Sequence, residues 1–244
     1  MNGMEKNRYI GIVADGTTDQ EIIAKFSKCL SEKTISSKDV ILGQSFALDM
    51  QIFRRKSSES KNYGLYDVPA IELKNKIITI LSAAVGEFQS LIPRELKEFD
   101  LLVLNTDAEW YLSEQNNYFE KQNAVISKIF LIAIEDFYHL KEKYGYQWEQ
   151  LPLIIPLIFF PSTDILIAAL KIENIDTSPF GFHGLRANVI KKKLYGVEDL
   201  SELRDQEFKE KALDFITIDA IKSVYKYIPE SRLFLRILSW NQVI

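Results

Sequence analysis

Cysteine and histidine are scarce in this chain of 244 residues, which has one cysteine and two histidines. Cys29 therefore has no partner for a disulfide within the chain, and a zinc site built from cysteines is excluded. With only His139 and His183, a multi-histidine metal centre is excluded as well. Any metal must be held mainly by oxygen ligands, which favours magnesium, manganese or calcium over zinc.

Long hydrophobic runs are also missing. The first residues, Met1 to Lys6, contain no apolar signal core. The longest apolar run, from Leu151 to Phe160, is too short to span a bilayer and contains two prolines, so it predicts a buried strand. We therefore expect a cytoplasmic protein that has no membrane partner.

Two further absences limit the function. No Gly-x-x-x-x-Gly-Lys-Ser/Thr loop is present, so the chain is not itself a P-loop NTPase. The formal net charge of −4 argues against a uniformly basic surface that coats nucleic acid, although it allows a local basic groove.

The hydrophobic pattern predicts an α/β fold. Apolar segments that suit strands alternate with segments of helical spacing, which is typical of a mainly parallel four-stranded sheet with helices on both faces. The expected strands are Arg8–Ala14, Asp39–Ala47, Phe99–Leu104 and Leu153–Phe159. The expected helices span about 20–31, 68–90, 117–144 and 162–170. We expect this α/β domain to cover residues 1–174, and a mainly helical extension packed on it, with helices near 201–211 and 218–227, to cover residues 175–244.

Acidic residues follow three of the expected strands. Asp15 comes directly after the first strand, Asp107 and Glu109 follow the third, and Asp164 opens the helix after the fourth. In a parallel sheet these strand ends meet at one edge, where ligands bind. Clustered carboxylates bind Mg²⁺ or Mn²⁺, and such a metal polarises a phosphate and helps to form the nucleophile. The residues therefore predict a metal site for phosphodiester chemistry.

The order of these motifs resembles the TOPRIM family, the metal-binding domain of topoisomerases, primases and the overcoming-lysogeny-defect nucleases. The segment from Ala14 to Asp19 (ADGTTD) is similar to the family's Glu-Gly turn after the first strand. The segment from Asn105 to Glu109 (NTDAE) is similar to its Asp-x-Asp-x-Glu element, and the segment from Pro161 to Asp164 (PSTD) lies where these proteins carry another acid. The resemblance covers roughly residues 8–171.

The resemblance implies a nuclease that uses Mg²⁺ or Mn²⁺. It implies catalytic roles for Asp15, Asp107 and Glu109, and metal ligation by the same three residues together with Asn105 and Asp164. Two positions depart from the family pattern. Asp15 is one methylene shorter than the family's glutamate, which is thought to act as general base or acid, and a shift of order 1 Å can cost about 100-fold in rate. Asn105 replaces an aspartate and offers a metal a carbonyl oxygen without charge.

Each of these residues also has a structural interpretation. Asp15 and Asp19 are typical of a turn and a helix cap, with Thr18 or Asp19 as the capping residue. Asp107, Glu109 and Asp164 suit the first turn of a helix. Two basic clusters, 54–56 and 191–193, are either solvated charge runs or phosphate contacts beside the acids.

Three functions follow as hypotheses. The first is metal-dependent cleavage of nucleic acid, with or without a partner. The second is a catalytically degenerate TOPRIM-like subunit that binds nucleic acid or a partner protein such as an ATPase; Asn105 favours this one. The third is a phosphatase of the haloacid-dehalogenase type, because ADGT at Ala14–Thr17 echoes part of that family's Asp-x-Asp-Gly-Thr. Val13 stands where its nucleophilic aspartate would be, so no aspartyl-phosphate can form. The sequence leaves the oligomeric state open.

Overall fold

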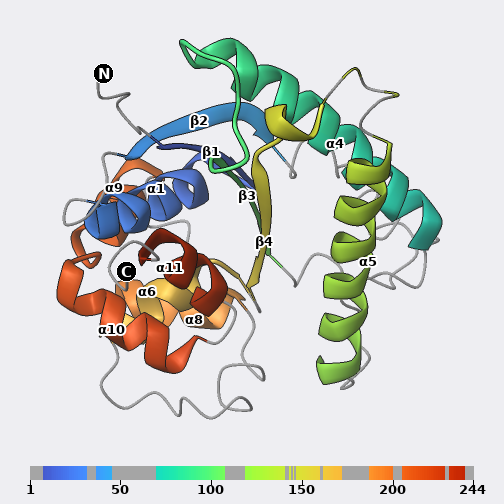
Figure 1. Cartoon of the computed structure of the whole chain (residues 1–244). Coiled ribbons are helices and arrows are strands. Elements are labelled where there is room, and N and C mark those ends of the chain that lie inside the picture. The colour runs from blue at the N-terminus through green and yellow to red at the C-terminus, as the bar shows by residue number, and fades with distance from the viewer. Residues whose placement is uncertain are drawn as a thin grey trace, which may run out of the picture.

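The strands form one parallel sheet. The computed structural model describes residues 8–31, 37–45, 70–107, 119–140, 143, 145, 147–159, 162–171, 187–199, 205–228 and 231–239. Strands β1 (Arg8–Ala14), β2 (Ser37–Ser45), β3 (Leu101–Asp107) and β4 (Leu153–Phe159) pair in the order β2-β1-β3-β4, and every pair is parallel (Figure 1). The expected α/β fold with a parallel sheet and helices is confirmed.

Helices cover both faces of the sheet. The helices between the strands are α1 (Thr17–Ser31), α4 (Ala70–Leu91) and α5 (Phe119–His139), followed before β4 by the short 3-10 helix η4 (Trp148–Gln150). After β4 come α6 (Asp164–Lys171), α8 (Ala187–Tyr195), α9 (Asp205–Asp214), α10 (Ile218–Tyr227) and α11 (Arg232–Ser239). No helix in the described part of the chain is both long and apolar enough to cross a membrane.

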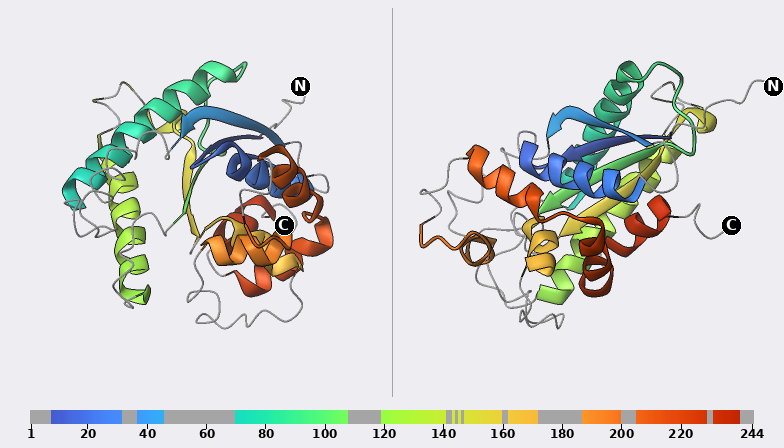
Figure 2. Two further views of the ribbon diagram at one scale, coloured as in Figure 1. Left: turned by 180° about the vertical axis from the view of Figure 1, so that it is seen from behind. Right: turned by 90° about the vertical axis from the view of Figure 1, so that its left-hand side faces the viewer.

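The direction of each crossover decides which face a helix covers. The chain moves from β1 outward to β2 and then returns past β1 to β3, so right-handed crossovers require α1 and α4 to lie on opposite faces. Figures 1 and 2 show this arrangement, with α4 and α5 on one side and α1, α6 and α8–α11 on the other. Two hydrophobic clusters correspond to these two sides.

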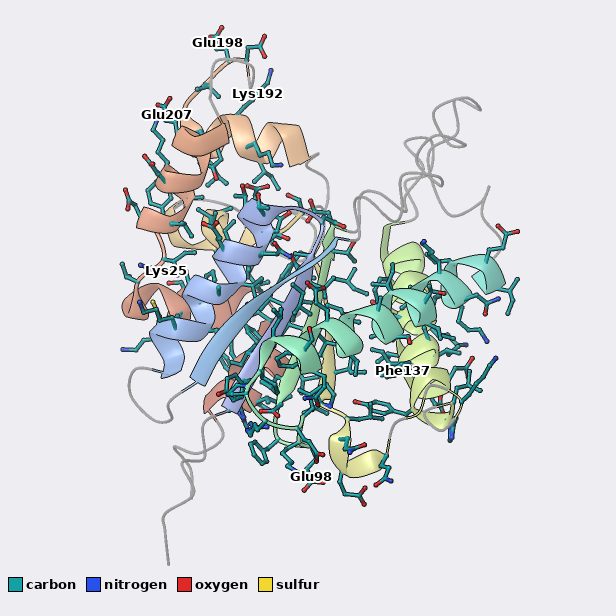
Figure 3. The ribbon with its side chains drawn as sticks, turned by 90° about the horizontal axis from the view of Figure 1, so that it is seen from above. Lys25, Glu98, Phe137, Lys192, Glu198 and Glu207 are labelled. Carbon is teal, nitrogen blue, oxygen red and sulfur yellow. The ribbon has the colours of Figure 1, made fainter. Side chains whose placement is uncertain are left out.

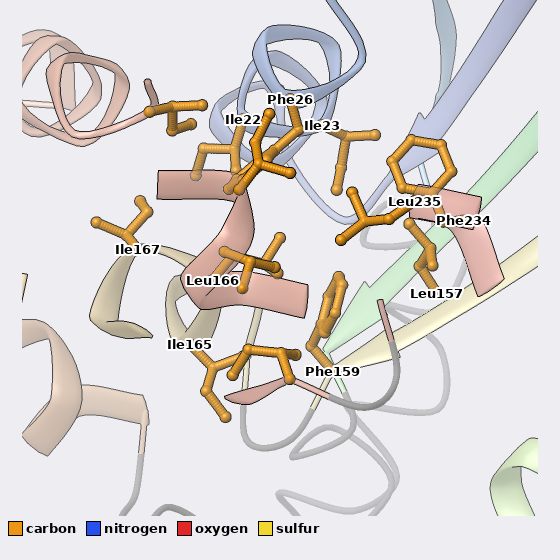
Figure 4. Close-up of a cluster of buried hydrophobic side chains, with 14 of the residues drawn as sticks. Ile22, Ile23, Phe26, Leu157, Phe159, Ile165, Leu166, Ile167, Phe234 and Leu235 are labelled. Carbon is orange, nitrogen blue, oxygen red and sulfur yellow. The ribbon is translucent and has the colours of Figure 1, made fainter. Parts of the chain in front are cut away.

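The final helices share a core with the sheet. Phe234 and Leu235 of α11 belong to the same buried cluster as Phe26 of α1 and Phe159 of β4 (Figure 4). Buried residues of α8, α9 and α10 belong to it as well. The described helices after residue 186 therefore cover the α1 face of the sheet and complete its core.

Several boundaries differ from those expected from the sequence; for example, β3 begins at Leu101 rather than Phe99, and α5 ends at His139 rather than near residue 144. Strand β3 continues to Asp107, because β4 pairs with it through the last register pair, Asp107 with Phe159. Helix α1 begins at Thr17, so Gly16 takes the cap position expected for Thr18 or Asp19. Its carbonyl accepts the first helical hydrogen bond, from the Gln20 N–H at 3.1 Å. Strand β2 spans Ser37–Ser45, two residues earlier than the prediction.

The close packing of α4 on β1 explains why residue 11 is a glycine. Gly11 lies in the middle of β1, and a Cβ atom there would come within 2.9 Å of the Phe88 ring of α4. That distance is shorter than van der Waals contact allows, so only glycine lets Phe88 pack flat on β1. Pro156, which lacks an N–H, is tolerated in β4 because β4 is an edge strand of this sheet.

A buried ion pair fastens the amino end of the sheet. Asp100 is fully buried before β3 and receives two hydrogen bonds of 2.7 Å from the Arg94 guanidinium, one on each carboxylate oxygen. The backbone N–H groups of Tyr9 and Lys97 also donate to this carboxylate, each at 2.9 Å. The Asp100 carbonyl accepts from the Leu153 N–H at 2.8 Å. One residue thus links the starts of β1, β3 and β4.

We expect Asp100→Ala to lower the free energy of unfolding by about 3 kcal/mol, because it leaves a guanidinium and two N–H groups without their acceptor. Urea denaturation measures the change. The matched control is Glu98→Ala, an exposed acid two residues away, which should shift stability by less than about 0.5 kcal/mol. Equal losses in the two variants would show that the Asp100 network does not hold the strands together.

Candidate functional site

The candidate site lies where the strand order changes direction. The chain leaves β1 toward β2 on one side, and later returns to β3 on the other side of β1. A crevice at the carboxyl ends of two such strands is the usual ligand site of open α/β sheets. Asp15 follows β1 directly, and Asp107 ends β3. The sequence prediction that these two acids share one sheet edge is confirmed.

Asp15 joins the ends of the two strands through its side chain. The backbone pairing of β1 with β3 stops at Val13 and Leu104. Beyond that point, the Asp15 carboxylate accepts a 2.6 Å hydrogen bond from the Asp107 N–H and one of 3.0–3.1 Å from the Thr106 hydroxyl. Asp15 is only 8% exposed. Its carboxylate therefore takes over the acceptor role that a backbone carbonyl has further down the ladder.

The side chains of Asn105 and Asp107 lie on the face of β3 opposite to that of Thr106, because residues two apart on a strand share a face. Thr163, just before α6, donates its hydroxyl to Asn105 Oδ1 and to Asp107 Oδ1, both at 3.0 Å. Its N–H donates to the same Asp107 oxygen at 2.8 Å. The Asn105 amide donates to the Leu157 carbonyl at 3.3 Å, and the residue is fully buried. Asn105 thus ties β3 to β4 and to the start of α6.

Asp19 brings a further carboxylate to this edge from the first turn of α1. The Gly16 N–H donates to its carboxylate, which is half of a capping box. Burial, reinforced by the negative charges of Asp164 and Asp15, raises the pKa of Asp19 to about 7, although Lys191 and the Gly16 hydrogen bond oppose the rise. Asp19 therefore lies within electrostatic reach of both acids.

Asp164, the first residue of α6, faces a lysine from the tail. Lys191 of α8 places its Nζ 3.2 Å from Asp164 Oδ2, and the Ser162 hydroxyl donates to the same oxygen at 3.1 Å. Burial alone would lower the pKa of Lys191, but the charges of Asp164, Asp107 and Asp19 outweigh it, so the pKa is raised. Burial and the Asp164 charge also raise the pKa of the nearby Tyr195 hydroxyl, which stays protonated.

Among the described residues, the acids at this edge outnumber the bases: four aspartates and one lysine, Lys191, converge there. Burial, with the charges of Asp19, Asp15 and Asp164, raises the pKa of Asp107 well above its ordinary value. Such a rise means that full ionisation is unfavourable unless more positive charge arrives. The oxygen donors and their excess negative charge suit Mg²⁺ or Mn²⁺ in their chemistry.

The acids at this edge are nevertheless engaged with donors of the protein itself. Among the described residues, no three aspartate, glutamate, histidine or cysteine side chains are grouped as ligands of one ion. The reason lies in the hydrogen bonds: Asp15 faces Thr106 and the Asp107 N–H, Asp107 faces Thr163, and Asp164 faces Lys191. The donors fit a divalent cation, and these contacts would have to open to admit it.

Part of this site was predicted from the sequence. Asp15, Asn105, Asp107 and Asp164 meet at one edge, whereas Glu109 and the basic cluster 54–56 lie outside the described residues. Of the basic cluster 191–193, Lys191 reaches the acids, while Lys192 and Lys193 are exposed. Figure 3 shows Lys192 at the outer margin of the tail helices, at the opposite end of the molecule from Glu98. His139 is exposed on α5, away from these acids.

Sequence reasoning assigned Thr106 and Thr163 no role at the site, and it treated Asp19 only as a cap and turn residue. The four-residue spacing of Asp15 and Asp19 was a usable signal, because a strand end and the first helical turn that follows it can aim two acids at one point. No sequence signal identifies which lysine of the tail pairs with Asp164, since that depends on how α8 packs against α6.

The raised pKa of Asp19 predicts how stability depends on pH. In the unfolded chain the pKa is about 3.8, and in the folded chain it is about 7. The contribution of Asp19 to stability is therefore complete below pH 3.8 and is lost as the pH rises through 7. We expect Asp19→Asn, measured in EDTA, to be more stable than the wild type by about 2 kcal/mol at pH 8.

The same variant should gain almost nothing at pH 3.5, where Asp19 is protonated in the folded chain and mostly protonated in the unfolded chain. Urea denaturation at the two pH values gives the comparison. Glu72→Gln is the matched control, because Glu72 is an exposed acid in the first turn of α4. A gain at pH 8 that Glu72→Gln also shows would assign the effect to general surface charge rather than to the acidic edge.

Comparison with known proteins supplies no relative. No protein-family model, curated protein or solved structure matches the chain. The chemistry of this sheet edge is therefore interpreted from its own residues and from the strand order that brings them together.

Proposed function

We propose that this chain is a TOPRIM-like, divalent-metal-dependent nuclease that cleaves phosphodiester bonds in nucleic acid. The observation that carries the proposal is the direct contact between Asp15 and the end of β3 at the point where the strand order reverses. A group of acids that outnumbers its bases, as the described residues of this edge do, is costly to a fold, so its presence favours a function that requires the charge.

Each acid has a role in this proposal. Asp107 and Asp164 would hold a divalent cation together with Asp19, and Asn105 keeps Thr163 and β4 in place beside them. When bound, the cation would polarise the phosphate and lower the pKa of an attacking water. Asp15, at the position of the family's glutamate, exchanges a proton with the nucleophile or the leaving group. Glu109 is a further ligand in the proposal, on the strength of the sequence motif.

Positive charge for the substrate comes from the tail. Lys191 lies among the acids, and Lys192 and Lys193 are exposed on the same helix, α8. A phosphodiester carries one negative charge per nucleotide, so lysines beside a metal site suit contacts to the phosphates on either side of the cleaved bond. A partner protein such as an ATPase is compatible with this arrangement but is not needed for the chemistry.

We expect the wild type to nick supercoiled plasmid in Mn²⁺ and to lose this activity in EDTA. Asp107→Asn should reduce nicking by at least about 100-fold, because it removes a central charge while its amide oxygen still accepts from Thr163. Agarose gel electrophoresis measures the rate. Asp214→Asn, the same change at an exposed position on α9, should be as active as the wild type.

Nicking activity that persists in Asp107→Asn, or in the presence of EDTA, would show that these acids are not the catalytic centre. Folding of the variant is checked by its urea unfolding curve, so that a loss of activity is not confused with a loss of structure.

A second candidate function is favoured by Asn105. Its amide group is fully buried and engaged with both Thr163 and Leu157, as a structural residue would be. A degenerate TOPRIM-like subunit that binds a partner protein or nucleic acid would keep the fold and let the metal site decay. This alternative predicts no Mn²⁺ binding to the isolated protein.

Asn105→Asp separates the two functions. The new carboxylate would face the Leu157 carbonyl, so we expect the variant to lose about 2 kcal/mol of stability in EDTA. For a nuclease, Mn²⁺ should restore that stability, bind more tightly than to the wild type and raise the nicking rate. For a degenerate subunit, the loss should persist in Mn²⁺. Thermal unfolding and titration calorimetry on the wild type and the variant distinguish these results.

A further inference from the structure

Lys191 is the one lysine or arginine of the described residues that forms an ion pair with an acid of this edge. It comes from α8, a helix beyond the region that resembles the TOPRIM family, and α8 packs against α6, the helix that Asp164 begins. The side chain is 30% exposed, and its ion pair with the buried Asp164 holds the ammonium group at the acids.

The ammonium lies where it opposes metal binding. It is 3.2 Å from Asp164 Oδ2, an oxygen that also accepts the Ser162 hydroxyl. Its charge also acts on Asp107 and Asp19. A divalent cation that used the same oxygen would meet a positive charge only a few ångströms away, in surroundings that screen it poorly. The two cations cannot both make close contact with that oxygen.

We propose that Lys191 is a built-in countercation that holds the acidic edge closed and competes with the divalent metal for Asp164. The inference rests on the proposed metal centre and adds its regulation: metal enters by displacing the lysine, so the packing of α8 sets the affinity of the site. A partner or substrate that draws α8 away from α6 would tighten metal binding. The same charge stabilises the metal-free protein.

The test replaces Lys191 and measures metal binding rather than catalysis. Lys191→Met keeps an unbranched side chain that is one heavy atom shorter and removes its charge. We expect it to bind Mn²⁺ about tenfold more tightly than the wild type in titration calorimetry at pH 8, since a nearby repulsion has gone. In EDTA its melting temperature should fall below that of the wild type, and Mn²⁺ should raise it by more than in the wild type.

Two control variants sharpen the result. Lys192→Met removes an exposed lysine from the same helix and should match the wild type in both measurements. Lys191→Arg keeps the charge and should bind Mn²⁺ no more tightly than the wild type. If Lys191→Met does not fold in EDTA, its refolding on addition of Mn²⁺, but not of NaCl at equal ionic strength, supports the proposal.

The outcomes separate the two proposals. Equal or weaker Mn²⁺ binding by Lys191→Met, with measurable binding by the wild type, overturns the competition and leaves the metal centre standing. Tighter binding by Lys192→Met to the same extent overturns it too, because the effect would then be one of overall charge. Failure of every variant to bind Mn²⁺ overturns the metal centre and the competition together.

Discussion

The acceptor role of the Asp15 carboxylate is the constraint on which the geometry of the acidic edge depends. Backbone pairing between β1 and β3 ends before the strands do, and a side chain completes it by accepting the Asp107 N–H. The contact fixes the direction of Asp107, because a strand residue whose N–H points to one neighbour must direct its side chain out of the sheet. The Asp107 carboxylate then accepts a hydrogen bond from the Thr163 N–H. Thr163 lies just before α6, the helix that begins with Asp164. One hydrogen bond thus aligns acids from separate parts of the chain.

Buried carboxylates are paired differently at the two ends of β3. At the amino end, Asp100 is matched by a bidentate guanidinium and two backbone N–H groups, so its charge is fully satisfied. At the carboxyl end, the described acids Asp19, Asp107 and Asp164 share one described lysine, Lys191. The first arrangement is that of a structural anchor, and the second is under electrostatic strain that a bound cation would relieve. The fully paired acid and the incompletely paired acids therefore lie at opposite ends of one strand.

The fold could be predicted from the sequence to the extent that it depends on local pattern. The two-sided apolarity of Arg8–Ala14 and Leu153–Phe159 identified both strands with their correct limits, since a strand buried on both faces has few alternatives. The end of β3 was missed because Asn105, Thr106 and Asp107 are polar, and only pairing with β4 keeps them in a strand. Helices α8 and α11 were also missed, although both contribute buried residues to the cluster that covers the α1 face of the sheet.

The candidate site was predictable in its acids and not in what surrounds them. Strand ends in a parallel sheet converge, so Asp15 and Asp107 could be brought together by counting residues from each strand. Thr106 and Thr163 could not, because threonines at strand ends are common and only their hydrogen bonds single them out. The partner of Asp164 depends on how residues far along the chain return to the sheet, which no local pattern encodes.

The position of Lys191 and helices α8 to α11 late in the sequence has a consequence for the synthesis of the protein. Synthesis runs from the amino terminus, so the strands and all four aspartates leave the ribosome before Lys191 does. During that interval the nascent sheet carries its acids without their lysine, and its α1 face lacks the cover that α8 to α11 provide. The nascent chain therefore passes through a stage in which one apolar face and one acidic edge are exposed together, and a cellular chaperone or divalent ions can act on it before its last helices arrive.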